Sequence, residues 1–533
     1  MDDEREPLVG RTSPTEHDWS STDTYSYEAE PNENLPSSPI TSDHNEPTRL
    51  KTVANNKSYA VQQHQIYGST STAISDASYT MRPCEDKRAD HPTTDFQTFI
   101  HLVKGNIGTG ALALPLAISK VGYILGPVLL VVLAVMCIHS MVLLVKSCQE
   151  LCKRVNKTTL DYGEVVEATF WQFKFKCNCC GHILNEQVLG KIAKATINIL
   201  LVATQFGFCC VYFIFWGINL KQIFDACGLE LPTRVWMLIM LPIVIVFTWI
   251  RNLDTLAPLS FVANVGLVFG IGSILFYLTD KMIEQKAAIF HDSDLSQNST
   301  LHSVTLSMTG LPLFFGNVLF TFEAIGLILP IENKMKNPHH FNVVLYLSMA
   351  LVTLIYLMIG VLGYLTFGST IEDSITLNLP RDKHPHSIVF HISKLYFCFA
   401  IFVTYMLCFY VPMDFLEPTL LRWLNIDKTK KAKKLTFHVV FRSIIVVITA
   451  GLALGIPKLD LFITLIGAFA SSLLAIIFPP ILEIAVFYKI PEPCWQKFFW
   501  VIKSLLILSV GLVGFFTGTF TSIQNIVKYI EGK

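Results

Sequence analysis

Two titratable side chains lie inside long apolar segments of this sequence, where a charge is costly. His101 belongs to the segment 96–119, and Glu323 belongs to the segment 309–331. An unperturbed histidine changes its charge at about pH 6.5, and a charge at the centre of a bilayer costs at least about 2.5 kcal/mol. We therefore assign His101 and Glu323 as candidates for proton transfer within a membrane. The structural alternatives are a histidine that only fixes a helix end, and a protonated or paired carboxyl that joins two helices.

The main chain offers a second kind of chemistry, because both segments contain helix-breaking residues. The first carries the run GNIGTG at 105–110 and then Pro115, and the second carries Pro312, Gly316 and Asn317. Glycine weakens a helix by roughly 0.8–1 kcal/mol relative to alanine, and proline removes a backbone donor. We expect each segment to form two half-helices joined by unwound backbone. Such a pair indicates the binding site of a transporter, with close helix crossings as the alternative.

A small solute that carries both an anionic and a cationic group would match the groups that these two breaks would expose. Free N–H groups in the first break, beside the positive end of a half-helix, would bind a carboxylate. Carbonyl groups released by the second break would accept hydrogen bonds from an ammonium group. Phe322 is a candidate lid of the cavity, and Tyr212 is a candidate part of its wall. The alternative for both residues is ordinary helix packing. The predicted substrate-binding residues are Asn106, Ile107, Gly108, Thr109, Gly110, Phe320, Thr321, Phe322 and Tyr212.

Composition places most of the chain in a lipid bilayer. Of 533 residues, 52% are hydrophobic and only 15% are charged, whereas soluble domains have roughly 25% charged residues. The formal net charge is zero, so no nucleic-acid partner is predicted. The 13 cysteines are scattered, many of them in apolar runs, and indicate buried thiols rather than a disulfide framework.

The apolar segments predict an all-α integral membrane protein with eleven transmembrane helices. A disordered cytosolic tail is expected over 1–95, the transmembrane domain over 96–522, and a short lumenal or extracellular C-terminus over 523–533. The expected spans are 96–119, 121–147, 191–220, 234–250, 255–281, 309–331, 343–368, 388–418, 437–456, 459–488 and 498–522.

Lysine and arginine concentrate in alternate loops, among them 153–176 and 428–434, which predicts a cytosolic N-terminus. The sequon at Asn298 then lies on the lumenal or extracellular side, where it is a candidate for glycosylation.

The run EREPLV at 4–9 resembles an acidic dileucine sorting signal, so sorting adaptors are candidate partners of the tail. The crowded run CNCCGH at 177–182 does not fit structural zinc spacing, and no metal site is predicted.

Several long motifs resemble the proton-coupled amino acid transporter family, in the amino acid/auxin permease group of the amino acid–polyamine–organocation superfamily. They include HLVKGNIGTGALALPLA at 101–117, FTFEAIGLILPIENKMKNP at 320–338 and PKLDLFITLIGAFASSLLAIIFPP at 457–480. The resemblance implies a LeuT-like fold, a 5+5 inverted repeat plus one helix, with helices 1 and 6 broken. It further implies symport of protons with glycine, alanine or proline, and it marks His101 as the residue of proton coupling. The family's cysteine after the LNLP motif is missing, since Arg381 follows Pro380 here.

The expected function is proton-coupled uptake of small neutral amino acids into the cytosol, at the lysosomal or late endosomal membrane, the plasma membrane, or both. A sodium-coupled or vesicular carrier of the same fold is one alternative. A membrane sensor or scaffold that signals through its tail is another. No nucleophile–base pair, metal-binding helix or phosphate loop stands out, so an enzyme is not predicted, and no cofactor is expected beyond the coupling proton. Lys104, beside the first break, either neutralises Glu323 or faces the cytosolic vestibule.

Overall fold

The computed structural model describes residues 92–172, 186–250, 257–291, 308–380, 387–424, 431–488 and 493–532. The chain divides into two units, Met1–Arg82 and Pro83–Lys533, and every described residue belongs to the second. In these ranges the chain is helical, apart from turns, connections and one isolated bridge between Thr93 and Met335. The expected tail, through residue 91, lies outside the described residues.

The helices follow the order predicted from the apolar segments. Within the described ranges, nine are long and apolar enough to cross a membrane, or ten if the bent pair α2–α3 counts as one span. The helix α7 lies at the fourth predicted span, 234–250, and is apolar but has only 16 residues, so the predicted count of eleven spans is not confirmed by helix length. The bounds are α2 Asp95–Asn106, α3 Thr109–Val121, α4 Leu125–Val155, α5 Tyr162–Gln172, α6 Glu186–Asp225, α7 Thr233–Thr248, α8 Ala257–His291, α10 Leu311–Thr321, α11 Ile325–Lys334, α12 Phe341–Phe367, α13 Ser387–Trp423, α14 Lys431–Gly455, α15 Leu459–Ile466, α16 Phe478–Phe487 and α17 Cys494–Ile530.

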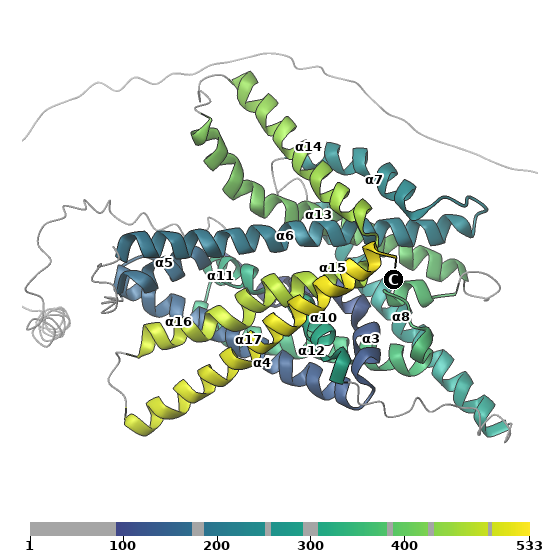
Figure 1. Ribbon diagram of the computed structural model, residues 1–533, viewed down its shortest axis with the longest axis horizontal. Helices are drawn as coiled ribbons and strands as arrows, with labels where there is room; N and C mark the ends of the chain where they lie inside the picture. Colours follow the sequence, from purple (N-terminus) through teal and green to yellow (C-terminus); the bar gives the residue numbers. More distant parts are fainter. Residues whose placement is uncertain are drawn as a thin grey trace, which may run out of the picture. The chain divides into compact units, whose positions relative to one another are not determined.

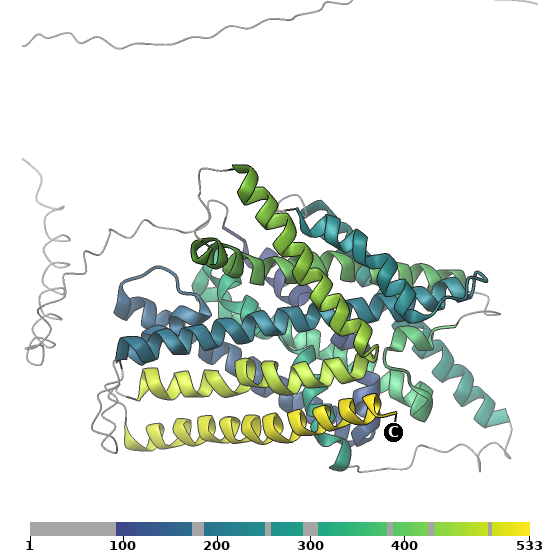
Figure 2. The same cartoon turned by 45° about the horizontal axis from the view of Figure 1, so that its top comes forward.

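Some elements differ from the predicted pattern, and α8, for instance, continues to His291 rather than ending at residue 281. The helix α5 lies in what was expected to be a loop, and the last helix, α17, continues to Ile530 rather than ending at residue 522. In both views α17 lies alongside the segment from α15 to α16 (Figure 1, Figure 2), which it contacts. The all-α membrane fold, with its first and sixth segments broken, is confirmed.

The first break separates α2 from α3 and bends the pair by 52°. Thr94 begins α2 with a capping box that involves Gln97, and Ile107 and Gly108 then leave the helix in extended conformation. A Cβ atom on Gly110 would lie 2.7 Å from Thr321 Oγ1 and 2.8 Å from Thr321 Cα. Glycine at this position therefore lets the first turn of α3 approach the end of α10.

The second break runs from Phe322 to Ala324, between α10 and α11. Opposite α10, the middle of the tenth span is wound as two π-helical turns, η6 (Gly467–Ser471) and η7 (Leu473–Ile477). Gly467 has no room for a side chain, because a Cβ atom there would overlap the carbonyl of Gly316. Close backbone contact thus joins η6 to the half-helix that leads into the second break.

Two packed clusters of apolar side chains flank the broken segments. One is built mainly from α4, α5, α11 and α12, and the other mainly from α6, α8 and α13. In α3, Leu114 packs into the first cluster and Ala113 into the second; around the second break, Phe322 packs into the first and Phe320 into the second. The breaks therefore lie where the two clusters meet, away from the exposed apolar faces of helices such as α14 and α17.

Candidate functional site

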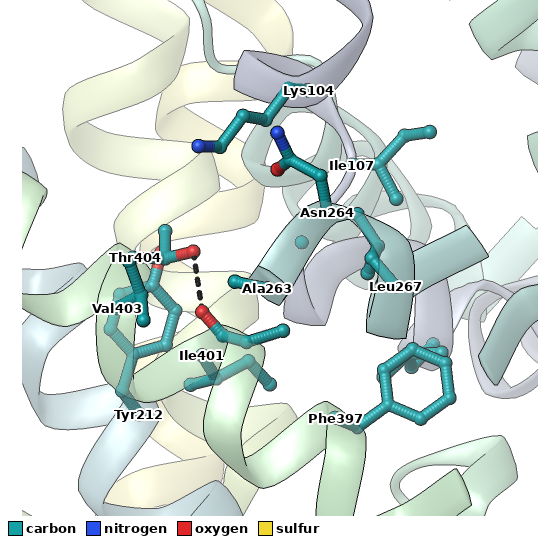
Figure 3. Close-up of a pocket in the computed structure, with 13 residues that line it drawn as sticks. Lys104, Ile107, Tyr212, Ala263, Asn264, Leu267, Phe397, Ile401, Val403 and Thr404 are labelled. Carbon is teal, nitrogen blue, oxygen red and sulfur yellow. Dashed lines mark hydrogen bonds between the residues drawn. The ribbon is translucent and has the colours of Figure 1, made fainter. Parts of the chain in front are cut away.

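A pocket opens beside the first break, between the α2–α3 junction, α6, α8 and α13 (Figure 3). Its empty volume is about 460 Å³ with the open mouth included. Most of the wall is apolar. The lining residues are Lys104, Ile107, Gly108, Leu112, Tyr212, Ala263, Asn264, Leu267, Phe397, Ala400, Ile401, Val403 and Thr404.

Three of the predicted binding residues, Ile107, Gly108 and Tyr212, line this pocket. A Cβ atom on Gly108 would meet nothing within 4 Å, so the backbone faces open space there. In the described part of the chain, no hydrogen bond is made by the N–H groups of Gly108, Thr109 and Gly110. These donors carry the positive end of the α3 dipole, which is the arrangement that binds an anion at a helix start.

Asn106 and Thr109 are buried at the junction and do not line the pocket. The amide nitrogen of Asn106 donates to the carbonyl of Leu102 at 2.8 Å, whereas its Oδ1 atom is buried without a hydrogen-bond partner. Asn317 of α10 is fully buried, and neither polar atom of its side chain has a partner among the described residues. Unsatisfied polar atoms thus accompany both broken segments, although such groups are normally hydrogen-bonded when buried.

The second break does not present its carbonyl groups as expected. The carbonyl of Phe320 accepts from the N–H of Glu323 at 3.4 Å, and that of Phe322 accepts from Ala324 at 2.9 Å. The carbonyl of Thr321 accepts from the hydroxyl of Tyr356 at 3.1 Å. A tight turn and one side chain therefore occupy the acceptors that were expected to be free, and these three residues do not line the pocket.

Tyr356 of α12 contacts both breaks and was not identified from the sequence. Its hydroxyl lies 2.5 Å from the carbonyl oxygen of Asn106 as well as 3.1 Å from that of Thr321. Its ring packs edge-on against Phe322 at 5.1 Å between centroids, and both rings are fully buried. Phe322 therefore serves packing here rather than closing the pocket as a lid. The sequence offered no distinctive signal for this residue, because the same apolar run also contains Tyr346 and Tyr364.

Glu323 lies in the second break with its Oε2 atom buried and without a hydrogen-bond partner. The polar groups around it come from three other elements: Cys137 of α4, Tyr162 of α5 and Ser471 of η6. The Tyr162 hydroxyl donates to the carbonyl of Leu474 at 2.8 Å. No ion pair involves Glu323 within the described ranges, and Lys104 does not neutralise it there. A carboxyl in such surroundings is stable when it is neutral.

His101 is exposed on α2 and is not among the residues that line the pocket. Its charged neighbours are Lys104 and Lys334. The structure thus places the two predicted proton carriers in different environments, His101 at an accessible helix face and Glu323 in a buried break. Lys104, by contrast, faces the pocket.

An ion pair joins the far end of α3 to the start of the tenth span. The ammonium of Lys120 lies 2.6 Å from a carboxylate oxygen of Asp460, with both side chains mostly buried. Asp373, in the connection after α12, lies close enough to interact with both charges. Burial raises the pKa of the Asp373 carboxyl, and the negative charge of Asp460 raises it further.

Two other buried charged side chains form hydrogen bonds or an ion pair, and neither was identified from the sequence. Lys394 of α13 donates to the side-chain oxygen of Gln222 at 2.7 Å. Arg442 of α14 is paired with Glu417 of α13, and also donates to the carbonyl of Thr248 at 2.7 Å. They join α13 to α6 and to the α7–α14 pair, which indicates a structural role.

Some predicted features lie outside the described residues: Asn298, the sorting-like run 4–9 and the cysteine-rich run 177–182. Among the residues that are described, no group of three or more histidine, cysteine, aspartate or glutamate side chains is placed to hold a metal ion.

An all-helical membrane protein, with two interrupted spans beside a small pocket, belongs to the class of membrane transport proteins rather than enzymes. The chain is a member of the family described as transmembrane amino acid transporter protein, whose model matches residues 91–524. It is 34% identical to the proton-coupled amino acid transporter-like protein pathetic of Drosophila melanogaster, over 82% of this chain and 86% of that protein. It is 24% identical to amino acid transporter AVT3C of Arabidopsis thaliana, over 85% of this chain and 97% of that one.

Among solved structures, the chain is similar to MhsT in complex with L-phenylalanine. The TM-score is 0.46 at 13% sequence identity, over 79% of this chain and 98% of that chain.

Proposed function

We propose that this amino acid transporter is a proton-coupled symporter that moves small neutral amino acids into the cytosol. The observation that carries the proposal is the junction of two broken spans, where free backbone donors adjoin a pocket and the carboxyl of Glu323 has no cationic partner among the described residues. The free backbone donors suit the carboxylate of a zwitterion. The carboxyl of Glu323 suits a group that takes up and releases a proton within the membrane.

The substrate carboxylate is assigned to the start of α3, where the N–H groups of Gly108, Thr109 and Gly110 have no partner in the described chain. The ammonium group is assigned to the carbonyls of Asn106 and Thr321, which do not line the pocket and are reached only when their contacts with Tyr356 are released. Both now accept from Tyr356, whose single hydroxyl proton cannot satisfy two acceptors at full strength. An ammonium has three protons and is the better donor for two carbonyls.

Glu323 is assigned as the residue that carries the coupling proton. Its burial favours the neutral form, so that release of the proton requires the surroundings to open or rearrange. The π-helical turns η6 and η7 pass next to it with Ser471, and π-bulges are frequent at functional sites. His101 is assigned to proton exchange at the accessible face of α2, because an imidazole ring can both bind and release a proton.

The finer assignments of residence and partners belong to the same proposal. Positive loop charge supports a cytosolic N-terminus, and the run 4–9 supports sorting adaptors and lysosomal or late endosomal residence, with the plasma membrane as the other site. Asn298 is the proposed glycosylation site on the opposite side.

The test is uptake into proteoliposomes that contain the full chain. An inward proton gradient is imposed with choline as the main external cation, and uptake of radiolabelled glycine, alanine and proline is followed. Accumulation that rises with the gradient and disappears with a protonophore is the expected result. Uptake that needs sodium, or that ignores pH, contradicts proton coupling and favours the sodium-coupled alternative.

A sensor or scaffold that signals through its tail is the second candidate function. It predicts amino acid binding without accumulation, together with substrate-dependent recruitment of cytosolic proteins to a transport-dead variant such as Glu323→Gln. Robust gradient-driven accumulation by the wild-type protein in the absence of any other protein argues against it.

A further inference from the structure

The pocket has one polar end and one apolar end. Among its described lining residues, Lys104 contributes the only ammonium and Asn264 the only amide, and none contributes a carboxylate. Figure 3 shows the polar ends of Lys104 and Asn264 together at one end of the view, with the ring of Phe397 at the other end. Ile401 and Leu267 extend the apolar wall. The shape and chemistry fit a ligand with one anionic end and one uncharged end.

Lys104 has no carboxylate partner in the part of the chain that the structure describes. Two other lysines of the spanning helices differ from it, because Lys120 pairs with Asp460 and Lys394 donates to the side-chain oxygen of Gln222. His101, on the same helix, lies close enough to interact with Lys104 but offers it no negative charge. A partly buried cation without a counter-ion attracts an anion and repels a second cation much more strongly than it would in water.

Free backbone donors add to the positive character of the same region. Gly108 lines the pocket one turn after Lys104, and the N–H groups at the start of α3 have no partner among the described residues. The hydroxyl of Thr404 donates to the carbonyl of Ala400 at 2.9 Å, so its oxygen can only accept there and carries no formal charge. An amino acid with a cationic side chain would find positive groups at one end of the pocket and no acceptor carboxylate at the other.

We propose that Lys104, supported by Asn264, selects substrates by charge: it binds the carboxylate of neutral amino acids and excludes amino acids with cationic side chains. This assignment rests on the proposed function as an amino acid carrier and identifies the residue that sets its substrate class. It differs from a purely structural role, because the selectivity for charge, and not only the affinity, depends on the ammonium group.

The test compares the wild-type chain with Lys104→Met, Lys104→Arg and Asn264→Ala in proteoliposomes and in detergent. Methionine keeps the length and much of the volume of lysine without its charge, and arginine keeps the charge. KM and maximal rate are measured for alanine, and excess lysine and arginine are added as competitors. Binding of the same amino acids is measured independently through the thermal stabilisation of the purified protein.

Lys104→Met is expected to raise KM for alanine about tenfold, the loss that corresponds to one charge-assisted contact, and to make cationic amino acids effective competitors. Lys104→Arg is expected to keep the exclusion of cationic amino acids. Asn264→Ala is expected to raise KM for alanine while cationic amino acids remain excluded. An unchanged KM, with cationic amino acids still excluded by Lys104→Met, overturns the proposal.

The two measurements separate this proposal from the proposed function. If the wild-type protein binds neutral amino acids selectively but shows no proton-driven uptake, the coupling is wrong and the role of Lys104 is judged from the binding data alone. If the wild-type protein binds no amino acid, the selectivity proposal is overturned together with the function. A Lys104→Met protein that melts like the wild type but is stabilised by lysine supports the proposal in either case.

Discussion

The hydroxyl group of Tyr356 lies 2.5 Å from the carbonyl oxygen of Asn106, and 3.1 Å from that of Thr321. Asn106 ends the half-helix before the first break, and Thr321 ends the half-helix before the second. One side chain of α12 therefore holds both interruptions together at a fully buried point. Any movement that separates the two breaks must release at least one of these hydrogen bonds.

Replacement of Tyr356 by phenylalanine is expected to lower the free energy of unfolding by about 1–3 kcal/mol, because two buried carbonyls lose their donor. Addition of alanine is expected to restore more stability than in the wild type, since its ammonium then meets no competing hydroxyl. Thermal melting of the purified protein, with and without alanine, measures both effects. Tyr346→Phe on the exposed face of α12 is the matched control. Equal melting of both variants and the wild type contradicts the bridging role.

Replacement of Glu323 by glutamine is expected to abolish proton-driven accumulation while leaving substrate exchange intact. Glutamine keeps the size and the hydrogen-bonding capacity of a neutral carboxyl but cannot release a proton. Accumulative uptake and counterflow in proteoliposomes separate the two processes. Glu332→Gln is the control, since Glu332 of α11 is also buried but is hydrogen-bonded to Gln149 at 3.0 Å. Accumulation by Glu323→Gln at the wild-type level would exclude Glu323 as the carrier of the proton.

His101→Ala is also expected to abolish proton-driven accumulation, through loss of the group that exchanges protons at the accessible face of α2. The dependence of initial uptake rate on external pH is the measurement. His340→Ala, which removes an exposed histidine 2.8 Å from Asp95, is the control for loss of a surface imidazole. A pH profile that His101→Ala leaves unaltered assigns this histidine to helix structure instead.

Two glycines of the first break are expected to respond differently to one added methyl group. Gly110→Ala would place its Cβ atom 2.8 Å from the backbone of Thr321, so we expect destabilisation of about 1–3 kcal/mol from overpacking. Gly108→Ala meets open space at the pocket and is expected to fold normally but to raise KM for alanine. Melting temperature and transport kinetics of the two variants decide this. Normal stability of Gly110→Ala would show that α3 and α10 do not pack closely at this point.

The face formed by Lys120, Asp460 and Asp373 is expected to lose stability as the pH rises. The pKa of Asp373 is raised by burial and then by Asp460, so the folded state binds its proton more tightly than the unfolded chain does. Stability from this group is therefore full below the unfolded pKa of about 3.9 and is lost as pH rises through the higher folded pKa. As the pH is raised from 4, the melting temperature of the Asp373→Asn variant is expected to fall less steeply than that of the wild-type protein. Parallel curves for the variant and the wild type contradict the assignment.

The membrane fold could be predicted from local sequence, because every helix that spans a bilayer must be long and apolar. The runs at 96–119 and 309–331 also revealed their own breaks, since glycine and proline weaken a helix wherever they occur. The helix α7, by contrast, is shorter than an ordinary membrane-spanning helix. The helix α5 is an additional helix that was not predicted, because it contains no long apolar run. Helix ends depend on neighbours and caps, which apolarity does not encode.

The sequence by itself determined that Gly108 and Gly110 lie in unwound or tightly packed backbone and that Glu323 is a costly carboxyl in an apolar span. Only the tertiary structure decided that Tyr356 bonds to both breaks and that Lys104 lines the pocket with no carboxylate partner among the described residues. The physical reason is the range of each interaction. Backbone preference and burial cost act within a segment, whereas a hydrogen bond between residues 250 positions apart depends on how the helices pack.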